Sequence, residues 1–400
     1  MDESQDMNQL QYEIIRMLAA PENNLFLVGD DDQSIYRFRG ARPEIMMQFE
    51  KDYPNSKRLL LNVNYRSTPQ ILQVAGKLIA HNKKRFAKEI STPNAGGRNV
   101  ETLVCDNQAR QAEILVERLL ARKAAQNSLD GVAILSRTNG ELALLAGRLI
   151  DHNLPFYMKD RLPNLYEHWI AKDLLAYLFL AASKGRMRRQ DFIQVMNRPN
   201  RYISRNALYQ NEITFSHLYE HYRDKDWMCQ RIEEMEGHIG RLSRMNPFAG
   251  INYIRLGMGY QDYVRDYALS HNVNPEEYYE VLNQLQESAR GFASLSDWLD
   301  HIEDYSRKIK KTKDQQKQEG VLLATLHSSK GLEFDQVYII NVNEGTIPYR
   351  RALLPDQIEE ERRLFYVGIT RAKRELTISS CDYHYDKRLQ RSRFLEEITK

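Results

Sequence analysis

Short apolar runs that end in polar loops recur along the chain and predict the strands of a sheet. Residues 25–28 (LFLV) run directly into the polar stretch GDDDQS. The same plan continues into helical spacing in RLLLNVNYRSTPQILQVAGKLIAHN (58–82) and DGVAILSRTNGELALLAGRLIDHN (130–153). Residues 320–345 hold two more strands about a polar turn, and KRELTISSC (373–381) supplies a last one. Strands that alternate with helices predict right-handed crossovers and therefore a parallel sheet in an α/β fold.

The middle of the chain carries a different pattern. From about Lys184 to Gln318 the strand signal is nearly absent, and stretches rich in Tyr, Arg and Glu show helical spacing. The sequence NPEE predicts a helix start, with Asn274 as the cap and Pro275 at the first helical position. We therefore predict an all-helical domain inserted into the α/β domain, with KKTKDQQKQEG (310–320) as the returning linker.

Composition places the chain among ordinary globular proteins. Hydrophobic residues make up 42% and charged residues 28% of the sequence. The longest apolar run, LLAYLFLAA (174–182), is too short to span a bilayer and predicts a buried helix, so we expect no membrane partner. The sequence opens without a basic-then-apolar signal segment, and its three cysteines form no metal-spaced pair. We expect a cytoplasmic, reduced protein without disulfides or structural zinc.

The net charge of +3 gives no global argument for a polyanionic partner, but two local runs are strongly basic. Residues 184–205 hold seven basic residues against one acid, and residues 307–317 hold six against one. Such runs are either solvated faces or contacts to nucleic-acid phosphates. The sequence leaves both interpretations open.

Polar clusters follow the predicted strands, at the edge of a parallel sheet where ligands bind. In the opening DESQD, Asp2 is suited to bind Mg²⁺ and Glu3 to act as a general base for an attacking water. An acidic tail or a helix cap is the alternative for these two residues. Gln33 is a neutral amide at a strand end and is suited to sense a phosphate or a water.

Aromatic and basic residues alternate shortly after Gln33. Tyr36 and Phe38 alternate with Arg37 and Arg39. Rings stack on the bases of single-stranded nucleic acid, at ~1–3 kcal/mol each, while guanidinium groups hold phosphates. The alternative is a half-buried strand, SIYRF, with two different faces.

Three later clusters carry further candidate chemistry. Tyr65 can stack on an adenine while the adjacent Arg66 donates to a phosphate. In TLHSSKGLEF (325–334), Glu333 can accept a hydrogen bond from a ribose hydroxyl. Arg371, in GITRA, is a candidate arginine finger, a residue type worth ~10³–10⁵ in rate during phosphoryl transfer.

The order of these clusters resembles that of the UvrD/PcrA/Rep-like superfamily 1 DNA helicases. DESQD, GDDDQSIYRFRGA, NYRS, SRTN, TLHSSKGLEF and VGITRA follow one another along nearly the whole chain, and the inserted helical region matches least. The resemblance implies a RecA-like parallel-sheet lobe of the P-loop NTPase type, an inserted all-helical subdomain and the remnant of a first RecA-like lobe. The implied domains are 1–58 (remnant of the first lobe), 59–183 and 319–400 (second lobe), and 184–318 (helical insertion).

The resemblance also implies the site residues and the cofactors, ATP and Mg²⁺. The residues matching nucleotide-binding positions are Asp2, Glu3, Gln33, Tyr65, Arg66, Glu333 and Arg371. Among them Asp2 matches the metal ligand, and the catalytic positions are those of Glu3, Gln33, Arg66 and Arg371. The residues matching DNA-facing positions are Tyr36, Phe38, Arg39, Arg137, Asn139, Thr325 and His327. Phe38 stands where family members often carry tryptophan.

The phosphate loop GxxxxGK[ST] of such helicases does not occur in the 400 residues. AGKL (75–78) lacks both the glycine spacing and the Ser or Thr. We therefore expect the C-terminal portion of an ATP-dependent 3′–5′ helicase, which acts on single-stranded DNA and single/double-strand junctions. Its partner would be the missing N-terminal lobe, in the same gene or as a separate chain, and the chain alone would lack ATPase activity.

Two other functions stay open. The chain could be a non-catalytic module that binds DNA or a partner protein. It could also be the motor part of a helicase–nuclease subunit, although no downstream nuclease domain follows in the sequence. A phosphate loop encoded in frame upstream would distinguish the helicase from the non-catalytic module.

Overall fold

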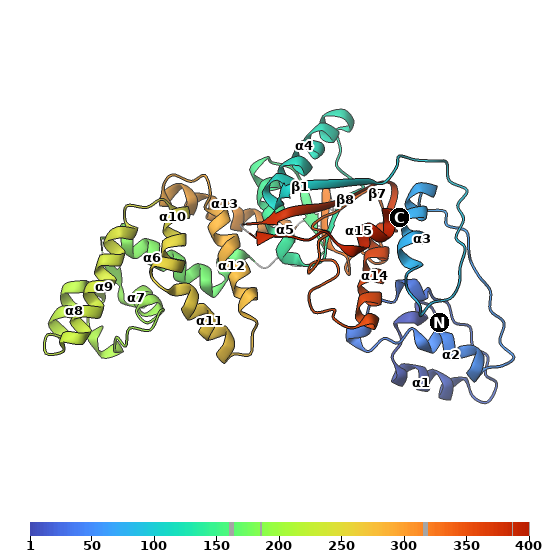
Figure 1. The fold of residues 1–400 in the computed structure, drawn as a ribbon, viewed down its shortest axis with the longest axis horizontal. Coiled ribbons are helices and arrows are strands. Elements are labelled where there is room, and N and C mark those ends of the chain that lie inside the picture. Colours follow the sequence, from blue (N-terminus) through green and yellow to red (C-terminus); the bar gives the residue numbers. More distant parts are fainter. Residues whose placement is uncertain (160–163, 185, 315–318, 386, 400) are drawn as a thin grey trace. The chain divides into compact units, whose positions relative to one another are not determined.

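The computed structural model describes residues 1–159, 164–184, 186–314, 319–385 and 387–399. The chain divides into two compact units (Figure 1). The first consists of Met1–Leu162 together with Thr312–Lys400, and the second of Pro163–Lys311.

The first unit is built on a mostly parallel sheet, as the sequence predicts. The strands lie in the order β1-β8-β7-β2-β6-β3, all parallel, and β9 pairs antiparallel with β8. Their bounds are β1 (Glu101–Asn107), β2 (Val132–Ser136), β3 (Phe156–Met158), β6 (Val321–Thr325), β7 (Phe334–Ile339), β8 (Ala372–His384) and β9 (Lys387–Arg388). Segments far apart in sequence thus share one sheet, and the α/β class is confirmed.

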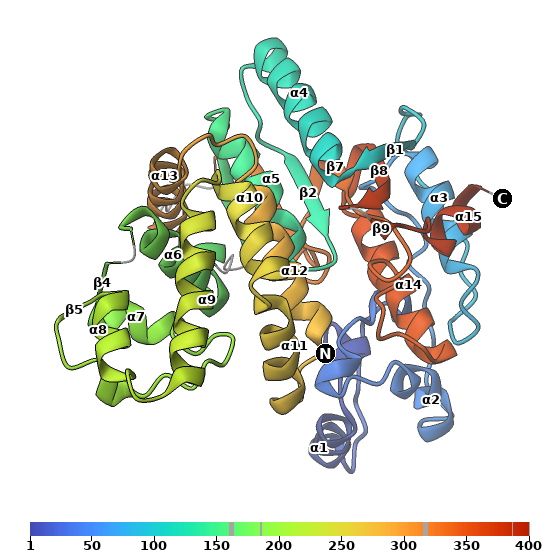
Figure 2. The same cartoon turned by 60° about the vertical axis from the view of Figure 1, so that its left-hand side comes forward.

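Helices cover both faces of this sheet (Figure 2). The helices of this unit are α1 (Gln9–Ala19), α2 (Glu44–Asp52), α3 (Pro69–Ile79), α4 (Gln108–Gln126), α5 (Asn139–Asp151), α14 (Pro355–Ile369) and α15 (Arg393–Thr399). The helices α3, α14 and α15 bury Ile71, Phe365 and Phe394 in one core with Leu135 and Ile378 of the strands. The helices α4 and α5 contact the strands from the other face.

Two of the predicted strands do not form. Residues 25–28 and 58–63 are extended but belong to no sheet, and Phe26 and Leu61 are 73% and 86% exposed. Val28 N donates to Met1 O at 2.8 Å, and Val63 forms an isolated bridge with Ser91. The prediction of a buried strand at 25–28 is therefore wrong for this chain, because no neighbouring strand among the described residues pairs with its backbone.

The second unit is helical, with a two-residue ladder between β4 (Met187–Arg188) and β5 (Glu212–Ile213). Its helices are α6 (Trp169–Ala182), α7 (Arg189–Val195), α8 (Phe215–His221), α9 (Asp226–Leu242), α10 (Pro247–Asn252), α11 (Tyr260–Ser270), α12 (Pro275–Ser288) and α13 (Leu295–Asp314). The helix α12 starts as predicted, since the Asn274 side chain accepts from Glu276 N and Pro275 is the first helical residue.

The helical unit begins earlier than the insertion predicted from residue 184. The helix α6 contains the apolar run predicted as a buried helix, and it packs on α7, α9, α10 and α12. Residues 315–318 of the predicted linker lie outside the described residues, whereas residues 310–314 end α13. Across the described residues, no helix combines the length and apolar character needed to cross a membrane.

Candidate functional site

A turn at residues 64–67 attaches Arg66 to the start of β8. Asn64 Oδ1 accepts hydrogen bonds from the backbone N–H groups of Arg66 and Ser67, both at 2.9 Å. Ser67 Oγ donates to Ala372 O at 2.7 Å. Because Ala372 follows Arg371 directly, the turn brings two arginines together that are separated by about three hundred residues of sequence.

Arg66 and Arg371 both contact Thr370. Arg66 Nη1 lies 3.5 Å from Thr370 O, and Arg371 Nη2 donates to Thr370 Oγ1 at 3.1 Å. Arg371 is buried and also donates to the carbonyl oxygens of Val367 and Leu332. The pKa of Arg371 is lowered to about 10, mainly by burial and secondly by the positive charge of Arg66. The arrangement concentrates positive charge, which favours an anionic ligand.

Gln33 lies against Arg371, 338 residues away in sequence. Arg371 Nη2 donates to Gln33 Oε1 at 3.2 Å, while Gln33 Nε2 donates to Asp30 Oδ2 at 2.7 Å. The short turn η2 (Asp31–Gln33) holds the side chain there. Three of the predicted catalytic residues, Gln33, Arg66 and Arg371, are thus brought together.

Glu333 bridges two cations beside this group. Its carboxylate accepts from Arg66 Nε at 2.8 Å and pairs with Lys373 Nζ at 2.6 Å. The hydrogen bond from Lys373, followed by that from Arg66, lowers the pKa of Glu333 to about 2. Tyr65, next to Arg66, is 76% exposed, so its ring can stack on a planar ligand.

Asp2 and Glu3 are exposed at the start of the chain, and Lys330 contacts Glu3. Glu3 Oε2 accepts from Gln5 Nε2 at 2.6 Å and lies 3.1 Å from Lys330 Nζ. Lys330 Nζ also donates to Gln33 O at 3.2 Å, which connects Glu3 with the Gln33 turn. Asp2 Oδ1 accepts from Glu3 N. An exposed pair of carboxylates is a donor set that fits Mg²⁺.

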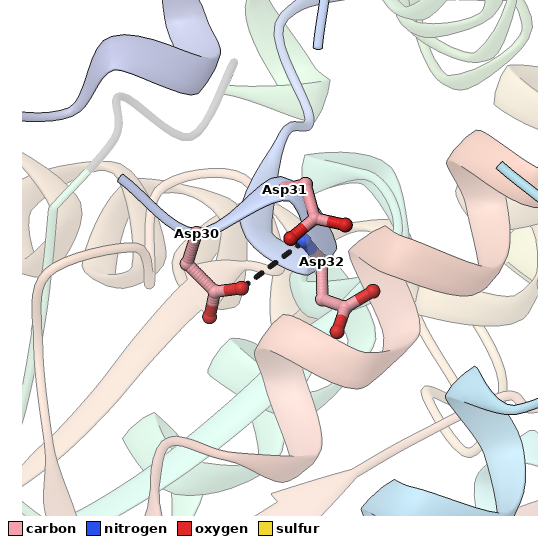
Figure 3. Close-up of side chains that lie close together, drawn as sticks. All are labelled: Asp30, Asp31 and Asp32. Atoms are coloured by element: carbon pink, nitrogen blue, oxygen red, sulfur yellow. Dashed lines mark hydrogen bonds between the residues drawn. The ribbon is translucent and has the colours of Figure 1, made fainter. Parts of the chain in front are cut away.

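Three aspartates precede Gln33, and their oxygen atoms lie within 4.8 Å of one another (Figure 3). Lys88 Nζ lies 2.5 Å from Asp30 and from Asp31, and 3.0 Å from Asp32. Arg85 donates two hydrogen bonds to Asp32, at 2.9 and 2.7 Å. An ammonium group therefore already contacts all three carboxylates. Sequence reasoning missed Lys88 and Arg85, because KRFAKE (84–89) has the composition of a solvated loop.

Four of the predicted DNA-facing residues form one cluster. The Phe38 and His327 rings meet edge-on with centroids 5.6 Å apart, and Tyr36 lies 6.0 Å from Phe38. The Arg39 guanidinium carbon lies 5.1 Å from the centroid of Tyr36 and 5.4 Å from that of Phe38. Phe38 is 66% exposed, so the cluster presents an aromatic surface to solvent.

The other predicted DNA-facing residues lie in different surroundings. Arg137 makes a two-pronged pair with Glu361 at 2.8–3.2 Å and lies over the Tyr349 ring. Thr325 is buried and bonds Ser328 Oγ at 2.9 Å. Asn139 is the first residue of α5. The charge of Arg137 is thus compensated within the protein.

The first basic run contains two arginines that make contacts within the helical unit. Arg198 Nη1 lies 2.8 Å from Asp173, a fully buried carboxylate. Arg201 is 8% exposed and donates to Tyr177 OH at 2.9 Å and to the carbonyl oxygens of Val195 and Met196. Arg201 therefore stabilises the interior of the helical unit, whereas Arg198 pairs with a buried carboxylate while its own side chain stays 36% exposed.

Comparisons with known proteins match the whole chain to one family. Residues 59–383 match the UvrD-like helicase C-terminal domain, and residues 1–54 match the UvrD/REP helicase N-terminal domain. The ATP-dependent DNA helicase Rep of Buchnera aphidicola is 30% identical and aligns with 100% of this chain and 65% of its own length.

Two further relatives agree with this match. Rep of Escherichia coli is 30% identical over 100% of this chain and 63% of its own length. The ATP-dependent DNA helicase PcrA of Bacillus subtilis is 30% identical over 95% of this chain and 54% of its own length. The chain therefore spans between about half and two thirds of the length of these curated relatives.

Proposed function

Because this chain belongs to the UvrD-like family of ATP-dependent DNA helicases, we propose that it forms the part of a 3′–5′ helicase that contacts the γ-phosphate of ATP and couples hydrolysis to movement along single-stranded DNA. One observation carries this proposal: Arg66 and Arg371, from distant segments, both contact Thr370, and Gln33, from a third segment, contacts Arg371.

Each nucleotide-site residue has a chemical task in this proposal. Arg66 and Arg371 donate to the transferring phosphoryl group and offset its developing charge. Tyr65 stacks on the adenine, Glu333 accepts from the ribose, and Gln33 reads the phosphate or the attacking water. Glu3 orients and deprotonates that water. Asp2 would hold Mg²⁺, which would supply further positive charge next to the phosphates.

The coupling to DNA follows from the short distance in sequence between Gln33 and the aromatic cluster. Gln33 contacts Arg371, and Tyr36 and Phe38 follow within five residues of Gln33. A shift of Gln33 on phosphate release would be passed directly to the rings that stack on bases. His327 contacts Phe38, and Lys330, three residues later, contacts Glu3. A second connection therefore runs between the DNA surface and the proposed base.

We also propose that a further lobe, carrying the phosphate loop, completes the nucleotide site from the same polypeptide or from a separate chain. The helix α1 supports this, since four apolar side chains on it are exposed at 48–80%: Leu10, Ile14, Met17 and Leu18. Their spacing is that of one helix face, which normally packs against another element. The extended and exposed residues 59–61 offer a second contact.

Binding to single-stranded DNA tests the proposal. We expect the purified chain to bind a fluorescent oligothymidine, measured by anisotropy, and Phe38→Ala to weaken binding roughly 5- to 150-fold, the equivalent of losing ~1–3 kcal/mol of stacking. Tyr209→Ala is the matched control, because Tyr209 is 60% exposed and lies in the helical unit. Equal losses in both variants, or no DNA binding by the wild type, would contradict the role of the aromatic cluster.

A non-catalytic DNA-binding module is the second candidate, favoured by the lack of a GxxxxGK[ST] sequence. Both candidates predict DNA binding. Only the helicase predicts that DNA-stimulated ATP hydrolysis appears once a lobe with a phosphate loop is present.

A further inference from the structure

We infer that Lys88, with Arg85, positions the side-chain amide of Gln33 through Asp30, so that its NH₂ group faces Asp30 and its carbonyl oxygen faces Arg371. Lys88 and Arg85 lie in the loop between α3 and β1, outside every sequence cluster that supported the proposed function. The inference rests on the proposed function for the ligand of Gln33, the phosphate or the attacking water. The orientation of the Gln33 amide rests only on its contacts with Asp30 and Arg371.

The contacts run in series from the loop to the arginine. Lys88 Nζ lies 2.5 Å from Asp30 Oδ1, and Asp30 Oδ2 accepts from Gln33 Nε2 at 2.7 Å. Gln33 Oε1 then accepts from Arg371 Nη2 at 3.2 Å. A flipped amide would place an oxygen against a carboxylate and an NH₂ group against a guanidinium. The ionised form of Asp30 therefore fixes the orientation of Gln33.

Keeping Asp30 ionised requires nearby positive charge. Three carboxylates within 4.8 Å of one another repel, and such crowding favours proton uptake by one of them. Lys88 and Arg85 offset two of the three negative charges.

The pKa values of Asp31 and Asp30 are shifted in opposite directions. Burial, followed by the charge of Asp32, raises the pKa of Asp31. Burial also raises the pKa of Asp30, but the Lys88 ammonium and hydrogen bonds from Lys88 and Gln33 outweigh it and leave that pKa below its ordinary value. Lys88 therefore favours the ionised form of Asp30, the carboxylate that accepts from Gln33.

The two cations have separable roles. Arg85 bonds Asp32 with two hydrogen bonds, and Phe86 N donates to Asp31 Oδ2 at 2.8 Å, so these contacts already fix the loop to the turn. Lys88 adds the contact to Asp30, the carboxylate that accepts a hydrogen bond from Gln33. Among the described residues, the charged and titratable groups that face Gln33 and this cluster include Asp30, Asp31, Asp32, Arg85, Lys88, Lys330, Tyr366 and Arg371.

The side-chain amide signal of Gln33 in the ¹⁵N-labelled 400-residue chain tests the inference. In the wild type we expect this signal to stay constant between about pH 6 and pH 8, well above the ordinary Asp pKa of about 3.9. Lys88→Met removes the charge that keeps Asp30 ionised, so the signal should move and should titrate at a higher pH than in the wild type. Lys88→Arg should restore the wild-type pattern.

Two further variants keep the test decisive. Lys84→Met is the matched control, because Lys84 lies in the same loop but pairs with Asp356 at 2.9 Å. If Lys88→Met does not fold, Asp30→Asn replaces it, since the two remaining aspartates are then balanced by Lys88 and Arg85. The Gln33 signal should again move. An unchanged signal in a folded Lys88→Met or Asp30→Asn variant would overturn the inference.

Addition of ATP separates the inference from the proposed function. A Gln33 signal that depends on Lys88 and also shifts with ATP supports both. A Gln33 signal that depends on Lys88 but ignores ATP, in the presence of the completing lobe, supports the positioning role and contradicts the proposed nucleotide site.

Discussion

Some residues of the candidate site could be predicted from the sequence, and others could not. The polar clusters that hold Gln33, Arg66 and Arg371 were recognisable in the sequence, and the structure brings all three together, although the apolar runs before Gln33 and Arg66 form no strand. Lys88 and Arg85 were not predictable, because a loop lysine 58 residues from its aspartate has no local sign of its partner. Arg137 was recognised in the sequence as a DNA-facing candidate, but its pairing with Glu361 has no sign in the sequence, because it depends on the tertiary fold.

Glu333 gives a residue-scale prediction about pH. Its pKa is lowered to about 2, by Lys373 first and Arg66 second. A carboxylate with a lowered folded-state pKa stabilises the fold above its unfolded-state pKa of about 4.3 and loses that contribution as the pH falls through the folded-state pKa. Because the side chain is 45% exposed, Glu333→Gln should lower the free energy of unfolding at pH 7 by at most ~1 kcal/mol.

Urea unfolding of the first unit at several pH values measures this effect. The difference between wild type and Glu333→Gln should shrink as the pH falls from about 4.3 to about 2, the window set by the two pKa values. Glu303→Gln, in the helical unit, is the control. A difference that stays constant over this window would show that the carboxylate charge of Glu333 contributes nothing.

At the scale of elements, central strands were predictable and edge strands were not. The strands β2 and β6 are buried at every position and appear in the sequence as continuous apolar runs. In contrast, β1 has mostly exposed positions and β3 has only three residues, so neither produces a clear pattern. The sequence predicted that α6 is a buried helix but assigned it to the second lobe. In the structure α6 packs against helices of the helical unit and therefore belongs to that unit.

The start of β6 gives an element-scale prediction. Gly320 has a φ of +97°, and a Cβ atom there would lie 2.2 Å from Pro155 O. Gly320→Ala should therefore lower the free energy of unfolding of the first unit by more than ~2 kcal/mol. Gly147→Ala, inside α5, is the control: its added methyl group would meet no atom within 4 Å, and it should stabilise by roughly 0.5–1 kcal/mol. Chemical denaturation compares the two, and similar effects would refute the steric argument.

At the scale of the whole molecule, the exposed apolar face of α1 and the lack of a phosphate-loop sequence lead to one prediction about activity. The 400-residue chain alone should show negligible DNA-stimulated ATP hydrolysis, because the GxxxxGK[ST] sequence, whose backbone N–H groups and lysine hold the β- and γ-phosphates, does not occur in it. Co-expression with a lobe that carries the loop should restore turnover, and Met17→Glu on α1 should prevent the restoration. Gln9→Glu, on the same helix, is the matched control. Sustained phosphate release by the chain alone in a coupled assay would contradict the proposal that a further lobe completes the nucleotide site.

The inserted position of the helical unit has a consequence for synthesis on the ribosome. Gln33 is translated 338 residues before its partner Arg371, and the entire unit of residues 163–311 is made between them. At about 5–20 residues per second, Arg371 is synthesised roughly 17–70 s after Gln33. During this time the helical unit can fold, whereas Glu3 and Gln33 still lack Lys330 and Arg371. The turn that carries Gln33 therefore reaches its final contacts only after the last part of the first unit, from Lys330 to Arg371, has been synthesised.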